Sequence, residues 1–244
     1  MDFKFIPVKT RVVMPPRDEI WDIIDSLEVE EGDIVFITSK ILAIHQGRCV
    51  KMGDAGKEDL IRRESEYWLP FTHRAGWRGN LTITDNTLIP AAGIDESNAN
   101  GHYILWPKDI DDFCAEIRKR LMRKFNITRL GVVATDSHTM PLRWGVTGIA
   151  IGLAGVEPLE DIRGEEDIFG RPMEVTQVDR IDALTGMAVL LMGEGAEVKP
   201  IVILRGYENV VFSENASMDG FKIPPEDDMY QPLLDVITSS PKKS

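Results

Sequence analysis

Four short apolar runs, separated by helix-like segments and long polar loops, most constrain what this chain can fold into. The runs span residues 34–38, 131–135, 147–153 and 201–204. Apolar runs of this length predict buried strands. A membrane-spanning helix needs about 18 apolar residues in a row, and none of these runs is close to that length. Residues 3–8 predict a further short strand. Because strands and helices neither alternate strictly nor segregate along the chain, the expected fold class is α+β.

Apolar residues at helical spacing predict four helices. The pattern occurs in residues 19–27, 58–69, 111–126 and 181–192. Pro70 is expected to end the second helix, and Asp111 to cap the third. Residues 71–80 have no periodicity and predict a loop, and the polar stretch that begins near Leu88 and ends at Gly101 predicts another.

The charge balance disfavours polyanionic partners. The chain of 244 residues has 28 Lys and Arg against 40 Asp and Glu, a formal net charge of −12. A nucleic acid would on average be repelled, although a bound divalent cation can still join carboxylates to a phosphate ligand. The two cysteines are too few for a disulfide framework, and the first residues carry no signal-peptide pattern. We therefore expect a soluble, cytoplasmic protein with no membrane partner.

Asp95 and Asp136 are the first candidates for a metal site. Asp95 lies in a polar loop, and Asp136 directly follows the apolar run 131–135. Carboxylates in such positions suit Mg²⁺ or Mn²⁺, which take oxygen ligands and keep positions open for phosphate. The alternative is that these residues form a turn and a helix cap, the usual role of isolated aspartates. Spacing alone favours this second interpretation.

Gly193-Glu194-Gly195 and Arg143 are weaker candidates. Paired glycines allow the backbone to approach a phosphate closely, but they are also typical of a helix end followed by a turn. Neither a GxxxxGK[ST] loop nor a GxGxxG after a strand occurs in the sequence, so neither common nucleotide-binding fold is indicated. Arg143 can bind a phosphate or carboxylate bidentately, or lie on the surface without such a role. The four histidines lack metal-binding spacing, and His138 alone is near a candidate residue.

Several ordered segments together resemble the coenzyme F-420-0:γ-glutamyl ligase family. They are residues 86–98, 131–137, 143–152, 167–171 and 189–195, and the similarity runs from about Phe3 to Gly206. Residues 39–50 and 226–234 are most similar to the branch described as folate-metabolism γ-glutamate ligases. The resemblance implies an α+β ligase fold with mixed sheets and flanking helices, rather than a P-loop or ATP-grasp fold. We place residues 1–212 in the ligase-like domain, which can comprise two intertwined subdomains. Residues 213–244 are acidic and contain prolines, and we expect them to form a frayed C-terminal tail.

The same resemblance implies a homodimeric amide ligase that depends on GTP and on Mn²⁺ or Mg²⁺. It would join L-glutamate to a carboxylate acceptor, either F-420-0 or a folate-like molecule, through an acyl phosphate. The implied metal ligands are Asp95, Asp136 and Ser137. The implied nucleotide contacts are Val12, Val13, Met14, Pro15, Ser39, Lys40, Asn98, Gly193, Glu194 and Gly195. Arg143 is the candidate catalytic residue, because it can stabilise phosphate charge or hold a glutamate carboxylate.

Three positions depart from the family pattern. Ile44 replaces a lysine, Met140 replaces an arginine, and Ala183 replaces an acidic residue. The loss of two cations near a triphosphate or an acidic acceptor can change the nucleotide, the acceptor or the activity itself. Because the metal carboxylates are retained, we favour a changed acceptor. The main alternative is a non-catalytic homologue that binds a nucleotide or a pterin-like ligand, and a peptide-directed acyl-activating enzyme is a weaker one.

Overall fold

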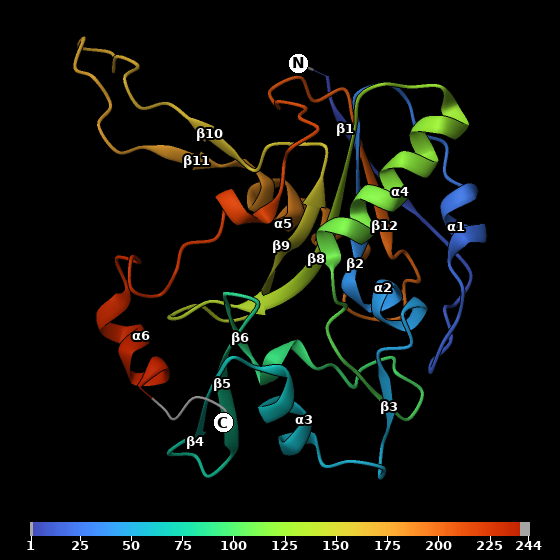
Figure 1. Ribbon diagram of the computed structural model, residues 1–244, viewed down its shortest axis with the longest axis vertical. Coiled ribbons are helices and arrows are strands. Elements are labelled where there is room, and N and C mark those ends of the chain that lie inside the picture. Colours follow the sequence, from blue (N-terminus) through green and yellow to red (C-terminus); the bar gives the residue numbers. More distant parts are fainter. Residues whose placement is uncertain (1, 240–244) are drawn as a thin grey trace.

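A five-stranded mixed sheet forms the centre of the molecule in this computed structural model, which describes residues 2–239 (Figure 1). Its strands, in spatial order, are β1 (Lys4–Val8), β12 (Ile201–Arg205), β2 (Asp33–Thr38), β8 (Leu130–Thr139) and β9 (Val146–Ala154). β2 and β8 run parallel, and the other neighbours in this sheet are antiparallel. The strands expected from the apolar runs are thus confirmed, and they belong to one sheet.

Helices cover both faces of this sheet. One face carries α1 (Trp21–Asp25), α2 (Ser39–His45) and α4 (Ile110–Phe125), and the other carries α5 (Arg180–Met192). Val35 and Ile37 of β2 belong to the first core, while Ile34 and Phe36 belong to the second. Successive side chains of a strand point to opposite faces, so a strand covered on both sides needs apolar residues throughout. This explains the continuous apolar run of β2.

A smaller α+β unit is attached beside the central sheet. It contains a three-stranded antiparallel sheet of β4 (Tyr67–Thr72), β5 (Arg78–Thr84) and β6 (Thr87–Pro90). The helix α3 (Lys57–Glu64) and the short 3₁₀ helix η1 (Ala91–Gly93) contribute to its own small core. The strands β3 (Cys49–Lys51) and β7 (His102–Ile104) pair where the chain enters and leaves this unit. The mixture of sheets and helices in both parts confirms the α+β class.

Two predictions for this smaller unit were wrong. The helix expected over residues 58–69 ends at Glu64, and Pro70 lies inside β4. Residues 78–80 of the expected loop belong to β5, which pairs with β4. β4 is an edge strand, where proline is tolerated because its missing N–H leaves no inner ladder bond unmade. The pairing between β4 and β5, not the local pattern, therefore decides the structure here.

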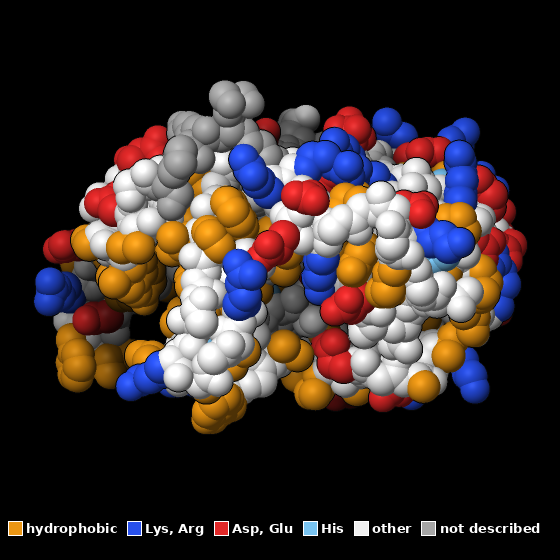
Figure 2. Space-filling view, turned by 90° about the horizontal axis from the view of Figure 1, so that it is seen from below, with side chains coloured by type: hydrophobic (Ala, Val, Ile, Leu, Met, Phe, Trp, Pro, Cys, Tyr) orange, Lys and Arg blue, Asp and Glu red, His pale blue; other side chains and the backbone are white. Residues whose placement is uncertain are grey.

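A two-stranded arm projects from the body of the molecule (Figure 1). It consists of β10 (Leu159–Asp161) and β11 (Gln177–Asp179), with a long connection between them. That connection exposes Ile168 and Phe169 almost completely, at 92% and 89%. In Figure 2, hydrophobic side chains gather toward the left of the view, whereas acidic and basic side chains are interspersed over the surface.

The prediction that the segment after residue 212 is frayed is wrong for residues 213–239, which form ordered structure. It contains η2 (Met218–Gly220) and α6 (Gln231–Thr238), and α6 packs against β4 and β5. Glu214 accepts two hydrogen bonds from the buried guanidinium of Arg118, at 2.7 and 2.6 Å. Residue 1 of the expected ligase domain and residues 240–244 of the expected tail lie outside the described residues. Along the described chain, no helix is long and apolar enough to cross a membrane.

Candidate active site

The carboxyl ends of the two parallel strands bring the first predicted residues together. Thr38, the last residue of β2, pairs with Thr135 of β8. Ser39 and Lys40 follow β2 directly, and Asp136 and Ser137 continue β8 past this pair. Ligands commonly bind beyond the carboxyl ends of parallel strands, where loops diverge and leave a crevice. The sheet topology therefore places the hydroxyl of Ser39, the ammonium of Lys40 and the carboxylate of Asp136 at the same end of the two strands.

A cavity of about 520 Å³ opens at this edge. Four connecting segments complete its wall: the β1–α1 loop, the start of α2, the loop between η1 and β7, and the loop between α5 and β12. The predicted residues that line it are Val12, Val13, Ser39, Lys40, Asp95, Asn98, Asp136, Ser137, Gly193, Glu194 and Gly195. Segments that are far apart in the sequence thus meet around one cavity of a size that accommodates a nucleotide.

Three predicted residues are not among those that line this cavity. Met14 and Pro15 lie further along the β1–α1 loop, beyond the lining residues Val12 and Val13. Arg143 lies in the exposed connection between β8 and β9, where its Nη1 donates to the carbonyl oxygen of Leu142. His138 also lies outside the lining set. A role for Arg143 at the cavity would require movement of that hairpin or a contribution from a second subunit.

Asp95 and Lys40 form an ion pair in the wall of the cavity. The ammonium of Lys40 lies 2.6 Å from Oδ2 of Asp95 and donates to the carbonyl oxygen of Ser97 at 3.0 Å. Ser97 in turn donates its backbone N–H to Oδ1 and its hydroxyl to Oδ2 of Asp95. Burial raises the pKa of Asp95, but the hydrogen bond and positive charge of Lys40 outweigh this and hold it below its usual value. Asp95 is therefore ionised at neutral pH.

Asp136 is held on both of its carboxylate oxygens. The indole N–H of Trp106 donates to Oδ2, and the backbone N–H of Ser137 donates to Oδ1 at 2.8 Å. Burial raises the pKa of Asp136 to about 6, and the negative charge of Asp95 acts in the same direction. The two hydrogen bonds oppose this shift. Asp95 and Asp136 line the same cavity, so the charge of one acts on the other.

The residues present fit a hard divalent cation. Lys40 already places a positive charge against Asp95, so this oxygen cluster attracts cations. A divalent ion would also relieve the repulsion between Asp95 and Asp136. Residues 2–239 contain no group of three or more His, Cys, Asp or Glu side chains arranged to hold a metal. Two carboxylates suit Mg²⁺ or Mn²⁺, which commonly complete their shell with water and substrate phosphates.

The loop after α5 is joined to the loop that carries Asp95. Asn98 donates through Nδ2 to the carbonyl oxygen of Gly195 at 3.0 Å, and the N–H of Gly195 donates to Glu197 at 2.8 Å. Gly193 ends α5 with a φ of 80°, and a Cβ there would lie 2.4 Å from the Glu197 carboxyl carbon. Both the backbone conformation and this close approach require glycine. The helix-end interpretation of this segment is confirmed, and the segment also lines the cavity.

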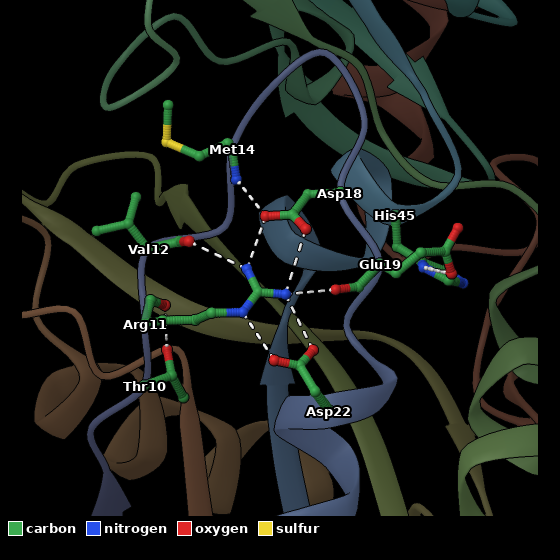
Figure 3. A network of polar contacts seen from close by, with 8 residues as sticks. All are labelled: Thr10, Arg11, Val12, Met14, Asp18, Glu19, Asp22 and His45. Carbon is green, nitrogen blue, oxygen red and sulfur yellow. Dashed lines mark hydrogen bonds and ion pairs between the residues drawn. The ribbon is translucent and has the colours of Figure 1, made fainter.

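Arg11 holds in place the β1–α1 loop, which forms one part of the wall (Figure 3). Its guanidinium donates to both oxygens of Asp18 and both oxygens of Asp22, and to the carbonyl oxygens of Glu19 and Val12. Asp18 also accepts the N–H of Met14 at 2.9 Å. Asp18 thus fixes the loop instead of capping α1, which shows no side-chain cap. One arginine at the base of the loop holds the predicted nucleotide contacts 12–15 in place.

Sequence reasoning missed Arg11, Ser97 and Trp106 as parts of the site. The Asp95-Glu-Ser97 order is an Asx-turn signal, and it could have identified Ser97. A buried tryptophan needs a partner for its indole N–H, but the sequence does not say which one. Of the three departures from the family pattern, Ile44 lines the cavity, whereas Met140 and Ala183 are exposed elsewhere.

Comparisons with known proteins agree on one family. The family model of F420-0:Gamma-glutamyl ligase matches residues 7–206. A protein of Methanopyrus kandleri named coenzyme F420:L-glutamate ligase is 34% identical over 82% of this chain and 85% of its own length. A protein of the same name from Methanothermobacter thermautotrophicus is 40% identical over 72% of this chain and 76% of its own length. A third protein of this name, from Methanocaldococcus jannaschii, is 31% identical over 86% of this chain and 89% of its own length.

Proposed function

The chain belongs to the F420-0:Gamma-glutamyl ligase family, and on this premise we propose that it is a γ-glutamyl ligase that uses GTP and a divalent metal ion. It would join L-glutamate to a small carboxylate acceptor. The observation that carries the proposal is the convergence of Asp95, Asp136 and Lys40 with the 193–195 segment around one cavity. This arrangement supplies anionic ligands for a metal, a cation for phosphate, and backbone that can approach a triphosphate.

The residues have separable roles in this proposal. Asp95, Asp136 and the hydroxyl of Ser137 would hold Mn²⁺ or Mg²⁺, which when bound neutralises phosphate charge. Lys40 would exchange its contact with Asp95 for one with a phosphate oxygen. The nucleotide would lie against Val12, Val13, Ser39, Asn98 and the 193–195 segment. Arg143 would serve as a catalytic residue through the hairpin movement or subunit contact described above.

The chemistry requires activation of the acceptor carboxylate, which is a poor acyl donor. Attack of a carboxylate oxygen on the γ-phosphorus of GTP forms a C–O–P bond and releases GDP. The amine of glutamate then attacks the carbonyl carbon, a C–N bond forms, and phosphate leaves with the electron pair of the C–O bond. The amine proton passes to solvent or to phosphate. In both steps the protein mainly positions reactants and compensates charge.

The acceptor would be F-420-0 or a folate-like carboxylate. The names of the curated relatives point to the first, and the resemblance to the folate-metabolism branch points to the second. Ile44 supports a changed acceptor or nucleotide contact, because an apolar residue with only 2% of its surface exposed stands beside the cavity where the family has a lysine. A ligase with a changed acceptor would still need its metal ligands, and both carboxylates, Asp95 and Asp136, are retained.

Mass spectrometry of each acceptor tests the proposal. The chain is incubated with L-glutamate, Mn²⁺ and either GTP or ATP, together with F-420-0 or a reduced folate. We expect one acceptor to gain a glutamyl residue with GTP, and Asp136→Asn to lower the rate at least about 100-fold because a metal carboxylate is lost. Asp54→Asn, an exposed substitution outside the cavity, should be neutral. Unchanged turnover in Asp136→Asn would remove the metal assignment.

A non-catalytic nucleotide- or pterin-binding homologue is the second candidate. The position of Arg143 outside the cavity favours it, as does the apolar Ile44. GDP release that requires both glutamate and an acceptor would eliminate this candidate. Nucleotide binding without GDP release under any combination would instead support it and contradict the ligase.

A further inference from the structure

Trp106 donates a hydrogen bond to one carboxylate of the candidate site from the segment that carries the other, and the family resemblance assigns it no role. It follows β7, and only 5% of its surface is exposed. Its indole N–H donates to Oδ2 of Asp136, and Ser137 donates to the other oxygen. An ionised carboxylate offers about four acceptor positions, so two donors fix its plane and leave the remaining lone pairs for a ligand.

The same tryptophan belongs to the segment that carries Asp95. The backbones of Asp95 and Ile104 exchange hydrogen bonds of 3.0 and 2.8 Å, which attaches Asp95 to β7 two residues before Trp106. The carbonyl oxygen of Trp106 accepts a hydrogen bond from Nε of Arg48 at 3.0 Å, and Arg48 pairs with Glu64. The backbone that bears the indole is therefore fixed to the smaller unit, whereas Asp136 belongs to the central sheet.

Gly93 completes the seat of the indole ring. A Cβ at Gly93 would lie 2.2 Å from Nε1 and 2.5 Å from Cε2 of Trp106, and the φ of this glycine is 68°. The ring therefore lies directly against the backbone two residues before Asp95. Any larger residue at position 93 would displace the ring and its hydrogen bond to Asp136.

We propose that Trp106 is a positioning residue that sets the orientation of Asp136 and its separation from Asp95, and so determines how tightly the site binds its divalent ion. This proposal rests on the proposed function. If Trp106 only filled space, its indole N–H would not need to be directed at the carboxylate of Asp136. Hydrogen-bond donors behind a metal ligand commonly affect metal affinity about 10–100-fold, because they fix the ligand's orientation.

The test is Mn²⁺ binding, read from the electron paramagnetic resonance signal of free Mn²⁺ at a fixed GTP concentration. The loss of signal that GTP alone causes is measured without protein and subtracted. Trp106→Phe keeps an aromatic ring but removes the donor. We expect its Kd for Mn²⁺ to rise about 10–100-fold, with little change in far-ultraviolet circular dichroism. Trp77→Phe, in the exposed β4–β5 hairpin, is the matched control and should bind as the parent chain does. An unchanged Kd in folded Trp106→Phe would overturn the proposal, and absence of Mn²⁺ binding by the parent chain would instead contradict the proposed function.

A second measurement uses the parent chain, in case Trp106→Phe does not fold. The chain has five tryptophans, and Trp106 is the most buried of them. Its indole N–H resonance should therefore be the slowest to exchange with deuterated solvent in nuclear magnetic resonance spectra. We expect Mg²⁺ with GTP to shift this resonance, and Asp136→Asn to shift it without nucleotide. A resonance that responds to neither would contradict the positioning role.

Discussion

Arg11 shows how one side chain can contribute to the site by holding a loop in place. It lines the cavity, but all three guanidinium nitrogens already donate hydrogen bonds within the β1–α1 loop. Hydrogen bonds from Arg11 hold the pKa values of Asp18 and Asp22 below their usual range. Its charge is thus already compensated by two carboxylates. We infer that Arg11 organises the loop and that Lys40 is the cation that can turn to phosphate.

Replacement of Arg11 by lysine tests this division of roles. A lysine ammonium is a point charge and cannot bridge Asp18, Asp22 and the loop carbonyls as the guanidinium fork does. We expect Arg11→Lys to destabilise the fold by about 1–2 kcal/mol and to raise the Kd for GTP with Mn²⁺ by up to about tenfold. Chemical denaturation and isothermal titration calorimetry measure the two effects. Arg17→Lys, in the same loop but exposed, is the control. Equal affinities in the two variants would show that the loop needs no such anchor.

Single site residues could be predicted where the signal lies in the neighbouring sequence. Asp95 and Asp136 were recognised as candidates because a polar loop and a strand end are visible in the sequence itself. The partner of Trp106 could not be predicted, because 30 residues separate it from Asp136 and their contact depends on how two units pack. Arg118 and Glu214 are 96 residues apart, which explains why the ordered C-terminal segment was missed.

β9 is an edge strand, and side chains cap two of its backbone N–H groups. Asp182 of α5 accepts the N–H of Ala150, and Asp111 of α4 accepts the N–H of Leu153. The pairing of β8 with β9 shifts register between Ala134 and Thr135, which leaves one extra residue on β9. Capping of an edge and a bulge protects a sheet against pairing with other chains. Asp111 was predicted to cap its own helix, and its carboxylate serves β9 instead.

Asp182 makes the stability of this element depend on pH. Burial raises its pKa from 3.8 to about 7, and the charge of Asp179 adds to the shift. The folded state then binds more protons than the unfolded state between about pH 4 and 7, so stability falls as pH rises through this window. We expect Asp182→Asn to flatten this fall and to be more stable than the parent chain at pH 8 by about 1–2 kcal/mol.

Urea denaturation at pH 5 and pH 8 measures the difference. The asparagine carbonyl can still accept the N–H of Ala150, so the contact with β9 is retained. Asp54→Asn, at an exposed position, should leave the pH dependence unchanged. A larger loss of stability for Asp182→Asn at pH 8 than at pH 5 would contradict the predicted sign.

Helices and strands with a clear hydrophobic pattern in their own sequence were predicted well. Strands that form only because they pair with another strand were not. The apolar run of β2 and the helical spacing of α4 and α5 correspond to the observed elements within a few residues. β4 and β5 form a sheet although neither has a clear alternating pattern of its own. Their pairing and the contact of α6 with both strands supply stability that the local sequence does not reveal.

At the scale of the whole molecule, the projecting arm exposes large apolar side chains. Ile168 and Phe169 lie in its connection, and Leu142 and Trp144 are exposed in the β8–β9 hairpin. Exposed apolar groups of this size favour burial against a partner. A homodimer would bury them, and it would supply the subunit contact that a role for Arg143 requires.

Substitution of Phe169 by aspartate tests the dimer. We expect sedimentation of the parent chain at about twice its mass of 27.4 kDa, and of Phe169→Asp near the monomer mass, because a charge would be buried in the interface. Met229→Asp, exposed at a different part of the surface, should remain dimeric. A monomeric parent chain at micromolar concentration would contradict the prediction.

The proposed metal–nucleotide site lies in the cavity at the carboxyl ends of β2 and β8, and thermal unfolding with nucleotides tests it without an acceptor. The parent chain and Asp136→Asn are heated with GTP, GDP, ATP or no nucleotide, each with and without Mn²⁺. A ligand at about 100 times its Kd stabilises the folded state by about 2.7 kcal/mol, which is a measurable shift in Tm. We predict a shift with GTP that requires Mn²⁺ and is lost in Asp136→Asn. A Tm that no nucleotide changes, or an equal shift in both proteins, would contradict a metal–nucleotide site built on Asp95 and Asp136.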